Sequence, residues 1–426
     1  MTPVSVLCLF FIFLAPLAPA GISLINTGLG RSRSAAHAML ASLCVIAVAA
    51  IAYAICGFAW QGVAGGPAHS FRAAGNEWNW IAAEPLFLRG RPMDGSPASL
   101  VILLQMLGAG LAALIPLGSG ADRWRLGASC ASAAVLAGFT YPLFAHWVWG
   151  GGWLAQLGVN YGLGHGFLDA GGASCIQTVG GLTALSVALI LGPRRAKFVT
   201  GGLPAAIPGH DAVVVLFGCF LAWLGWLGLN AAGAILFTGA EPGRVVLVAA
   251  NTTLCAAAGL LAAVATTSVR FGRPDASLCA NGWVGGLVAS SAACAFVPPA
   301  AALAIGLIAG VLVTITIAYV EMPLSIDDPG GAISVHAAAG LWGVLALGIF
   351  AQFPDNTSGQ WLAQLVGIAT LVGFVFPLTY SLNWILNQVS SQRVAPEGER
   401  QGMDLYELGA GAYPEFVTHN DEFTQL

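Results

Sequence analysis

Long apolar runs separated by short polar loops constrain the fold of this chain more than any other feature. Each run has about the length that a helix needs to cross a hydrocarbon core about 30 Å thick. Hydrophobic residues make up 57% of the chain and charged residues only 8%, which excludes a soluble domain. The sequence therefore predicts an all-α polytopic membrane protein with eleven transmembrane helices. We expect them near residues 3–28, 37–60, 97–118, 128–149, 170–192, 210–238, 246–268, 276–297, 300–320, 333–352 and 361–388.

The two ends of the chain complete this organisation. The segment ending in Pro-Ala20-Gly resembles a signal-peptide cleavage site, but no positive charge precedes it and the apolar run continues to Arg31. We therefore expect a first membrane span there. Residues 1–388 are predicted to form the transmembrane domain, and residues 389–426 a C-terminal tail.

The basic residues predict the orientation. With the amino terminus outside, eleven of the fifteen Lys and Arg residues fall in cytoplasmic loops and the tail, and four in outer loops. An odd number of spans then places the tail in the cytoplasm. We expect a multi-pass protein of the plasma (inner) membrane.

Two of the apolar runs share a polar register, which predicts a functional centre. In each, an Asp is followed by one residue and Gly-Gly, then by a lone polar side chain at the eighth position after the Asp, and by Gly four residues later. A separation of eight residues is about 12 Å along a helix, which carries the polar side chain to the middle of the bilayer. A polar residue at that depth suggests a transport path. The residues are Asp169, Gln177 and Gly181 in the first run, and Asp328, His336 and Gly340 in the second.

The two matching segments are predicted to be antiparallel, because the fifth span runs inward and the tenth outward. Spans one to five and six to ten then form an inverted 5+5 repeat, an organisation found in many transporters with functional residues at the midplane. We expect Gln177 and His336 to meet there. No P-loop, Gly-x-Ser-x-Gly elbow or His-Glu-x-x-His motif is present, so an enzyme is not expected. The nine cysteines lie in apolar runs without metal-ligand spacing, and no cofactor is expected.

The motifs, taken together, resemble the ammonium transporter (Amt/Mep/Rh) family over nearly the whole chain. The resemblance implies eleven helices in two inverted halves, a narrow pore in each subunit of a homotrimer, and ammonium or ammonia as the cargo. It rests on Trp149-Gly-Gly-Gly-Trp-Leu, Asp169-x-Gly-Gly, Leu-Gly-Pro-Arg-Arg195, Gly-Trp226-Leu-Gly-Leu-Asn230, Asn281-Gly-x-x-x-Gly, Asp327-Asp328-x5-Ser-Val-His336, and the tail motif from Gly402 to Phe416.

Several positions depart from the family pattern. A second pore histidine is expected where Gln177 stands, and the two aromatic residues of the outer pore mouth where Gly108 and Leu229 stand. Gly233 occupies the place of a serine that helps to bind the cation, and Gly331 that of an aspartate. These departures predict a wider mouth, unless neighbouring side chains such as Leu104 and Leu107 fill it, and weaker binding of external ammonium.

The remaining pore residues keep their predicted roles. The Trp149 indole is expected to recruit a cation through its ring face, although an interfacial aromatic belt is the alternative. Asp169 lies at a helix amino terminus, where it caps the helix and acts electrostatically without direct ligation. A buried neutral His336 suits ammonia conduction, whereas Gln177 does not readily pass on a proton, so we expect no histidine-to-histidine relay. Trp226 is expected to serve helix packing.

The leading hypothesis is transmembrane transport of ammonium or ammonia. A slow or non-conducting ammonium sensor, and a channel for another small neutral solute such as methylamine or carbon dioxide, remain alternatives. The tail segment from Met403 to Phe416 resembles a segment that meets a PII-type regulator in the family, but it could equally only brace the trimer.

Overall fold

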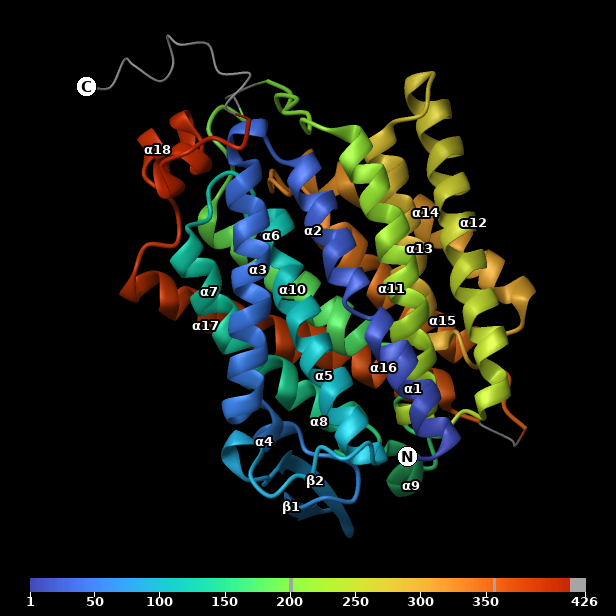
Figure 1. Ribbon diagram of the computed structural model, residues 1–426. Coiled ribbons are helices and arrows are strands. Elements are labelled where there is room, and N and C mark those ends of the chain that lie inside the picture. The colour runs from blue at the N-terminus through green and yellow to red at the C-terminus, as the bar shows by residue number, and fades with distance from the viewer. Residues whose placement is uncertain (199–201, 355–357, 414–426) are drawn as a thin grey trace.

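The computed structural model describes residues 1–198, 202–354 and 358–413, and shows a helical bundle capped at both ends (Figure 1). Within these residues, ten helical segments are long and apolar enough to cross a membrane. The 18-residue helix α13 packs among them and completes the predicted set of eleven. The membrane helices are α1 (Pro3–Leu14) with α2 (Leu17–Leu29), α3 (Ala35–Ala52) with α4 (Phe58–Gln61), α5 (Pro97–Leu114) with α6 (Pro116–Gly120), α7 (Leu126–Val135) with α8 (Tyr141–Trp149), α10 (Val179–Leu191), α11 (Ala212–Thr238), α12 (Val245–Phe271), α13 (Ala276–Ala293), α14 (Pro299–Glu321), α15 (Ala339–Phe350), and α16 (Gln360–Thr370) with α17 (Phe376–Val389).

Several membrane spans are interrupted, either by a proline that removes a helical hydrogen bond or by a π-helical turn. Pro16 and Pro116 lack a backbone N–H and divide the first and third spans into two helices each. Five further spans contain a π-helical turn of five or six residues, a feature common at functional sites. The fifth and tenth spans begin with such turns, η5 (Ala173–Thr178) and η7 (Ile333–Ala338).

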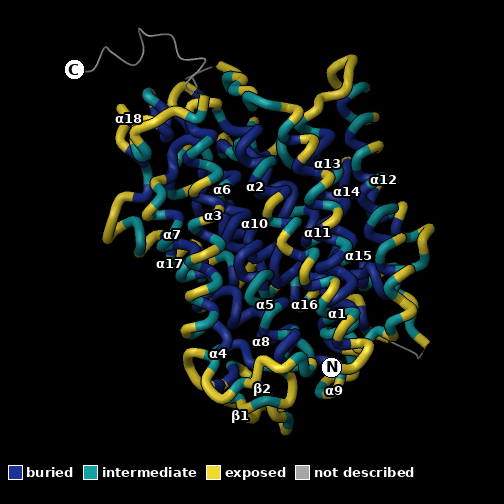
Figure 2. The backbone as a smooth tube through the Cα atoms, viewed as in Figure 1, coloured by how far each residue is buried: buried dark blue, intermediate teal, exposed yellow. Residues whose placement is uncertain are grey.

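The fifth and tenth spans cross at the centre of the bundle, where Figure 2 shows α10 among buried residues. Gly181 lies against the backbone of His336 and Ala337, so that a Cβ there would be only 2.8 Å from the Ala337 Cα. Gly340 lies reciprocally against Thr178 and Ala173, with 2.8 Å left between a Cβ and the Ala173 carbonyl oxygen. The glycines of the predicted register therefore allow the two backbones to touch.

These two spans are antiparallel, as predicted. The loop that leads into η5 donates backbone hydrogen bonds from Ala170 and Gly171 to the end of α13, and Gln352, just after α15, donates to Phe296 beside it. At the opposite end, Arg194, just after α10, binds Asp327, which precedes η7. Each span thus starts where the other ends.

A two-stranded hairpin, β1 (Ala68–Ala73) and β2 (Asn76–Ala82), covers one end of the bundle (Figure 1). Its turn places Ala74 and Gly75 at positive φ, the geometry of a two-residue hairpin loop. Asn79 on β2 accepts from the Trp153 backbone N–H, which ties the hairpin to the loop after α8. The all-α prediction made no provision for these strands. We call this the hairpin end; the amino terminus and α9 (Leu157–Tyr161) also lie here.

The described part of the tail folds against the opposite end, which we call the tail end (Figure 1). It contains α18 (Pro396–Gln401) and the π-helical turn η9 (Asp404–Leu408). Asp404 accepts from the backbone N–H groups of Ala36 and His37, so it caps α3. The chain begins at one end and Tyr413 lies at the other, as an odd number of crossings requires. Residues 414–416 of the tail motif lie outside the described residues.

A buried ionic network holds the loops of the tail end together. Arg194 donates to both oxygens of Asp327 at 2.9 and 3.0 Å and to Asp122 at 3.0 Å. Burial raises the pKa of Asp327, but the hydrogen bonds and charges of Arg194 and Arg123 outweigh it and leave this pKa below its ordinary value. Since the folded pKa is depressed, the contribution is present at neutral pH and is lost as the pH falls through the carboxylate range.

We expect Gly181→Ala to destabilise the protein, because the added methyl group has to push apart two backbones that touch. Overpacking of this kind costs about 1–3 kcal/mol. The matched control is Gly373→Ala, where a Cβ would meet nothing within 4 Å. Thermal unfolding in detergent should show a lower midpoint for Gly181→Ala alone; equal midpoints for the two variants would contradict the close crossing.

Candidate functional site

The centre of the bundle holds a hydrogen bond between the two predicted polar residues. The Nδ1 atom of His336 lies 2.8 Å from the Oε1 atom of Gln177, and both side chains are buried. Because an amide oxygen only accepts, the bond requires the proton on Nδ1, which leaves Nε2 of His336 as an acceptor. Within the described residues, Nε2 of Gln177 has no partner. The site therefore keeps one unused buried donor on Gln177 and one acceptor on His336.

Asp169 is committed to the start of η5. Its Oδ1 accepts from the backbone N–H groups of Gly172 and Ala173, and its Oδ2 from the backbone and hydroxyl of Ser174 and from the Cys175 N–H. A carboxylate with this many donors has no lone pair left to ligate a cation directly. Its negative charge still lies at the hairpin end of the span, where it acts through space.

Asp328 performs the same task at the tail end. Its Oδ1 accepts from Ser119 and the Ala332 N–H, and its Oδ2 from the Ile333 N–H. Each broken helix of the central pair therefore begins at a carboxylate, which is buried at Asp169 and half-buried at Asp328. The shared Asp-x-Gly-Gly motif corresponds to this cap.

A small cavity lies between the hairpin end and the central pair, beside Trp149. The Trp149 indole stacks on Phe237, with 4.2 Å between ring centroids, and donates to the Asp169 carbonyl oxygen at 2.7 Å. The cavity has a volume of about 10 Å³, close to the space that one water molecule needs. Trp149 thus forms part of the cavity wall. The lining residues are Leu104, Gln105, Tyr141, Trp149, Gly171, Ile176, Leu229 and Phe237.

The space beside Gly108 is filled, so the mouth is not wide there. A Cβ at Gly108 would lie 2.8 Å from the Tyr141 hydroxyl and 3.1 Å from the Ile176 Cδ1 atom. The Tyr141 hydroxyl donates to Gln105 Oε1 at 2.5 Å, and Nε2 of Gln105 has no partner among the described residues. Of the two outcomes left open by the sequence, filling by neighbouring side chains is the one observed. The side chains nearest to Gly108 are Tyr141 and Ile176, and not Leu104 or Leu107 as the sequence suggested.

The other predicted positions are placed around this cavity. Leu229 lines it, as the second of the two substituted aromatic positions. A Cβ at Gly233 would run into the Ala170 carbonyl oxygen, so the loop from Asp169 lies where a serine side chain would stand. Trp226 is fully buried and donates to Ser291, which agrees with a packing role.

The tail end of the central pair opens on a second cavity, of about 140 Å³. Asn281, Asp328 and Gly331 are among its lining residues. Gly331 has φ +70° and leaves only 2.5 Å between a Cβ and the Asn281 side-chain nitrogen, so an aspartate does not fit there. The backbone conformation of this loop therefore requires glycine at position 331, where the family pattern has an aspartate.

Sequence reasoning missed Tyr141, Ile176 and Phe237. A lone Gln105 in an apolar run was a detectable signal for the first, because a buried amide requires a partner. Ile176 and Phe237 carried no such signal, since an apolar residue in a membrane span has no distinguishing chemistry. Their positions follow from tertiary contacts alone.

The fold and the central pair define a polytopic membrane protein of the transporter type, with antiparallel broken helices that bring polar groups to the middle of the bundle. The chain belongs to the ammonium transporter family: the model of the Ammonium Transporter Family matches residues 5–413. It is 36% identical to the ammonium transporter Amt2 of Archaeoglobus fulgidus over 433 residues, which cover 96% of this chain and 88% of that protein. It is 30% identical to the ammonium transporter of Bacillus subtilis, with 96% of this chain and 98% of that protein covered.

Solved structures agree with this assignment. A structure described as a sensor Amt protein is 28% identical, covers 95% of this chain and 97% of its own, and has a TM-score of 0.84. Mep2 of Candida albicans is 23% identical, with a TM-score of 0.79 and coverage of 98% and 91%, which shows the shared fold.

We expect Asp169→Asn to destabilise the protein strongly. The amide would turn an NH₂ group toward backbone donors that now bind a carboxylate, and each bond to a charged group contributes about 1.5–3 kcal/mol. Asp94→Asn is the control, because Asp94 lies on the surface at the hairpin end and accepts from Ser96. Thermal unfolding in detergent is the measurement, and an unchanged midpoint for Asp169→Asn would contradict the capping role.

Proposed function

We propose that the protein transports ammonium or ammonia across the membrane through a path within each subunit. The observation that carries the proposal is the 2.8 Å contact between His336 and Gln177 at the crossing of two antiparallel spans. Ile176, the residue before Gln177, lines a cavity of single-molecule size. Membership in the ammonium transporter family supplies the cargo. Ammonium entry at Trp149 is a proposal that rests on the stacked Trp149 and Phe237 rings, whose faces attract cations.

The direct test is uptake into proteoliposomes of the purified protein. Ammonium and methylammonium should be compared at several pH values, with current recorded in parallel. Uptake of ammonium above that of empty liposomes is expected. A rate equal to that of empty liposomes for both amines would remove transport and leave the sensor alternative.

Gln177 limits proton transfer in this proposal. An amide accepts the His336 hydrogen bond but does not readily exchange protons, so the wild type should take up ammonia with little accompanying current. Gln177→His should raise the current per ammonium taken up, because it supplies a second titratable group to the chain of hydrogen bonds. Gln177→Leu is the control that removes the polar group without adding one. A wild-type current that is already large and unchanged in Gln177→His would show that no such relay is needed.

Ile176 is proposed as the gate that replaces the missing aromatic ring at Gly108. Its side chain lines the cavity and directly precedes Gln177 in the chain. Ile176→Ala should raise the ratio of methylammonium to ammonium uptake by roughly tenfold, because the methyl group of methylammonium needs the space that the gate occupies. Ile12→Ala is a matched truncation in the buried core of α1, and should leave this ratio unchanged. Equal ratios for the two variants would contradict the gate.

The surroundings of the path are proposed from the same arguments. The positive-inside pattern supports a plasma (inner) membrane location with the hairpin end outside, residues 1–388 as the transmembrane domain and residues 389–426 as a cytoplasmic tail.

A homotrimer in lipid is supported by apolar side chains exposed on the outer faces of α1 and α11, such as Phe10, Phe13 and Phe217. A PII-type regulator is proposed to contact the described tail while the tail is docked on the tail end of the bundle. The protein is proposed to have no enzymatic activity.

A sensor is the second candidate function. It is favoured by the similarity to the sensor Amt structure, together with the loss of a titratable group at Gln177. A sensor would bind ammonium at Trp149 with transport far slower than in a conducting relative measured beside it. The third candidate cargo, carbon dioxide or another small neutral solute, predicts uptake that does not depend on ammonium.

A further inference from the structure

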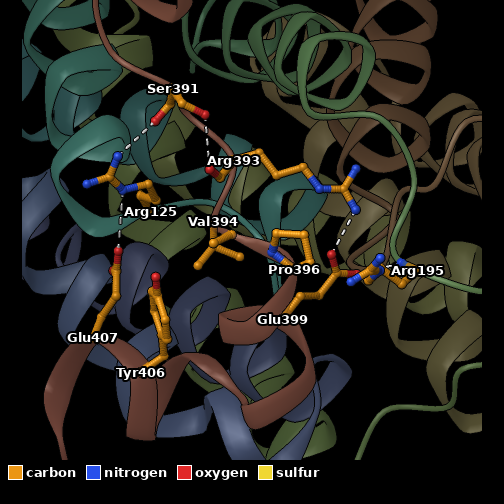
Figure 3. Close-up of a pocket in the computed structure, with 10 residues that line it drawn as sticks. Arg125, Arg195, Ser391, Arg393, Val394, Pro396, Glu399, Tyr406 and Glu407 are labelled. Atoms are coloured by element: carbon orange, nitrogen blue, oxygen red, sulfur yellow. Dashed lines mark hydrogen bonds and ion pairs between the residues drawn. The ribbon is translucent and has the colours of Figure 1, made fainter.

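A pocket at the tail end lies apart from the proposed path. It has a volume of about 900 Å³, and none of its lining residues belongs to the two cavities beside the central pair. Its walls come from the start of α7, the loop after α10, the segment from Ser391 to Pro396, and η9. Figure 3 shows Arg125 on one side and Arg195 on the other, with Val394 and Pro396 between them in this view. The site is thus built where the tail meets the bundle.

Three arginines line this pocket, and two of them have donors to spare. Arg125 has a side chain that is 48% exposed, with only long contacts of 3.3 Å to the Ser391 carbonyl and 3.8 Å to Glu407. Arg195 is exposed, and no bond from its guanidinium to another described residue is present; its backbone N–H donates to Glu399. Arg393 is already used, since it donates to the carbonyl oxygens of Leu191 and Pro193 and to Glu399.

The two carboxylates of the pocket are bonded mainly to other groups, and their one ion pair with a free arginine is the 3.8 Å contact of Glu407 with Arg125. Glu399 is 2% exposed, and its oxygens accept from the Arg195 backbone and from Arg393. One oxygen of Glu407 accepts from the Leu126 N–H and from His37, both at 2.9 Å. Burial raises the pKa of Glu407, but the hydrogen bonds from His37 and Leu126 outweigh it and leave this pKa below its ordinary value. Both carboxylates are therefore held in place by groups of the protein.

We propose that this pocket binds a molecule bearing a phosphate group, held by Arg125 and Arg195. Guanidinium groups match phosphate oxygens with paired N–H donors, and arginine is favoured for this task. A volume of about 900 Å³ exceeds what a bare phosphate fills, and Val394, Ala395 and Pro396 supply an apolar floor for an organic portion. The phosphate belongs either to a soluble nucleotide or to the headgroup of an anionic lipid. The lipid is a candidate because Val389, two residues before Ser391, is 81% exposed at the end of a membrane helix, where headgroups lie.

Occupation of the pocket would fasten the tail to the fourth and fifth spans, and the fifth span carries Gln177. Arg195 follows α10, the helix of the fifth span, and Arg125 begins the fourth span. The remaining walls belong to the tail. A ligand bridging these segments adds bonds between them, so it stabilises the docked tail by linkage.

The experiment uses the full-length protein and two phosphate probes. ATP and inorganic pyrophosphate are titrated into detergent-solubilised protein by calorimetry. In a second arm, the protein is placed in nanodiscs of phosphatidylcholine with or without phosphatidylglycerol. It is then released from the nanodiscs in the mass spectrometer, and the lipids that remain bound are identified by their mass. Saturable ATP or pyrophosphate binding that weakens with salt indicates a soluble ligand, and retained phosphatidylglycerol a lipid headgroup.

The variants decide whether this pocket is responsible. Arg195→Gln and the double variant Arg125→Gln/Arg195→Gln should weaken binding, the double variant by about tenfold or more. Arg195→Lys should keep part of the affinity, because the charge remains without the paired donors. Arg273→Gln removes an exposed arginine from the loop after α12 at the same end, and should change the affinity less than about twofold.

Three results would overturn the proposal. They are no binding of either soluble probe together with no preference for phosphatidylglycerol, binding that the double variant leaves unchanged, or an equal loss in Arg273→Gln. Because Arg195 makes no side-chain bond to the other described residues, the single variant is expected to fold even if the double variant does not. None of these measurements depends on transport.

Discussion

The contact between two antiparallel broken helices is the interaction on which the rest of this structure depends. Gly181 and Gly340 let the backbones touch, and Asp169 and Asp328 terminate the helices by binding the N–H groups that the break exposes. In lipid these N–H groups have no water to bind, so a carboxylate that accepts from them is what makes such a break tolerable. The crossing then fixes the distance between Gln177 and His336 without any further element.

The hairpin end is organised around the same carboxylate. Asp169 caps η5 with its side chain and accepts the Trp149 indole N–H with its carbonyl oxygen, so one residue positions both the helix and the aromatic wall. The loop around it packs so closely on α11 that Gly233 has no room for a side chain. A serine at position 233, as in the family pattern, would therefore not fit between this loop and α11.

Substitution at the gate illustrates how packing compensates for a lost side chain. Gly108 alone would leave a hole, but Tyr141 and Ile176 occupy it, and the cavity that remains has room for one small molecule. At the tail end, carboxylates and arginines of the loops and tail hold one another. Among the arginines that line the tail-end pocket, Arg125 and Arg195 have donors left over, which separates the phosphate pocket from the structural network.

The sequence by itself determined the eleven spans, the antiparallel pair and the meeting of Gln177 with His336. Apolar run length, basic residues and a repeated register each act along one segment, so they are legible without coordinates. The tertiary structure alone decided that Ile176 and Tyr141 fill the mouth, that Gly233 faces a carbonyl, and that a hairpin covers one end. These depend on which apolar surfaces meet across the bundle, and apolar residues in membrane spans are too alike in chemistry for a sequence pattern to choose among partners.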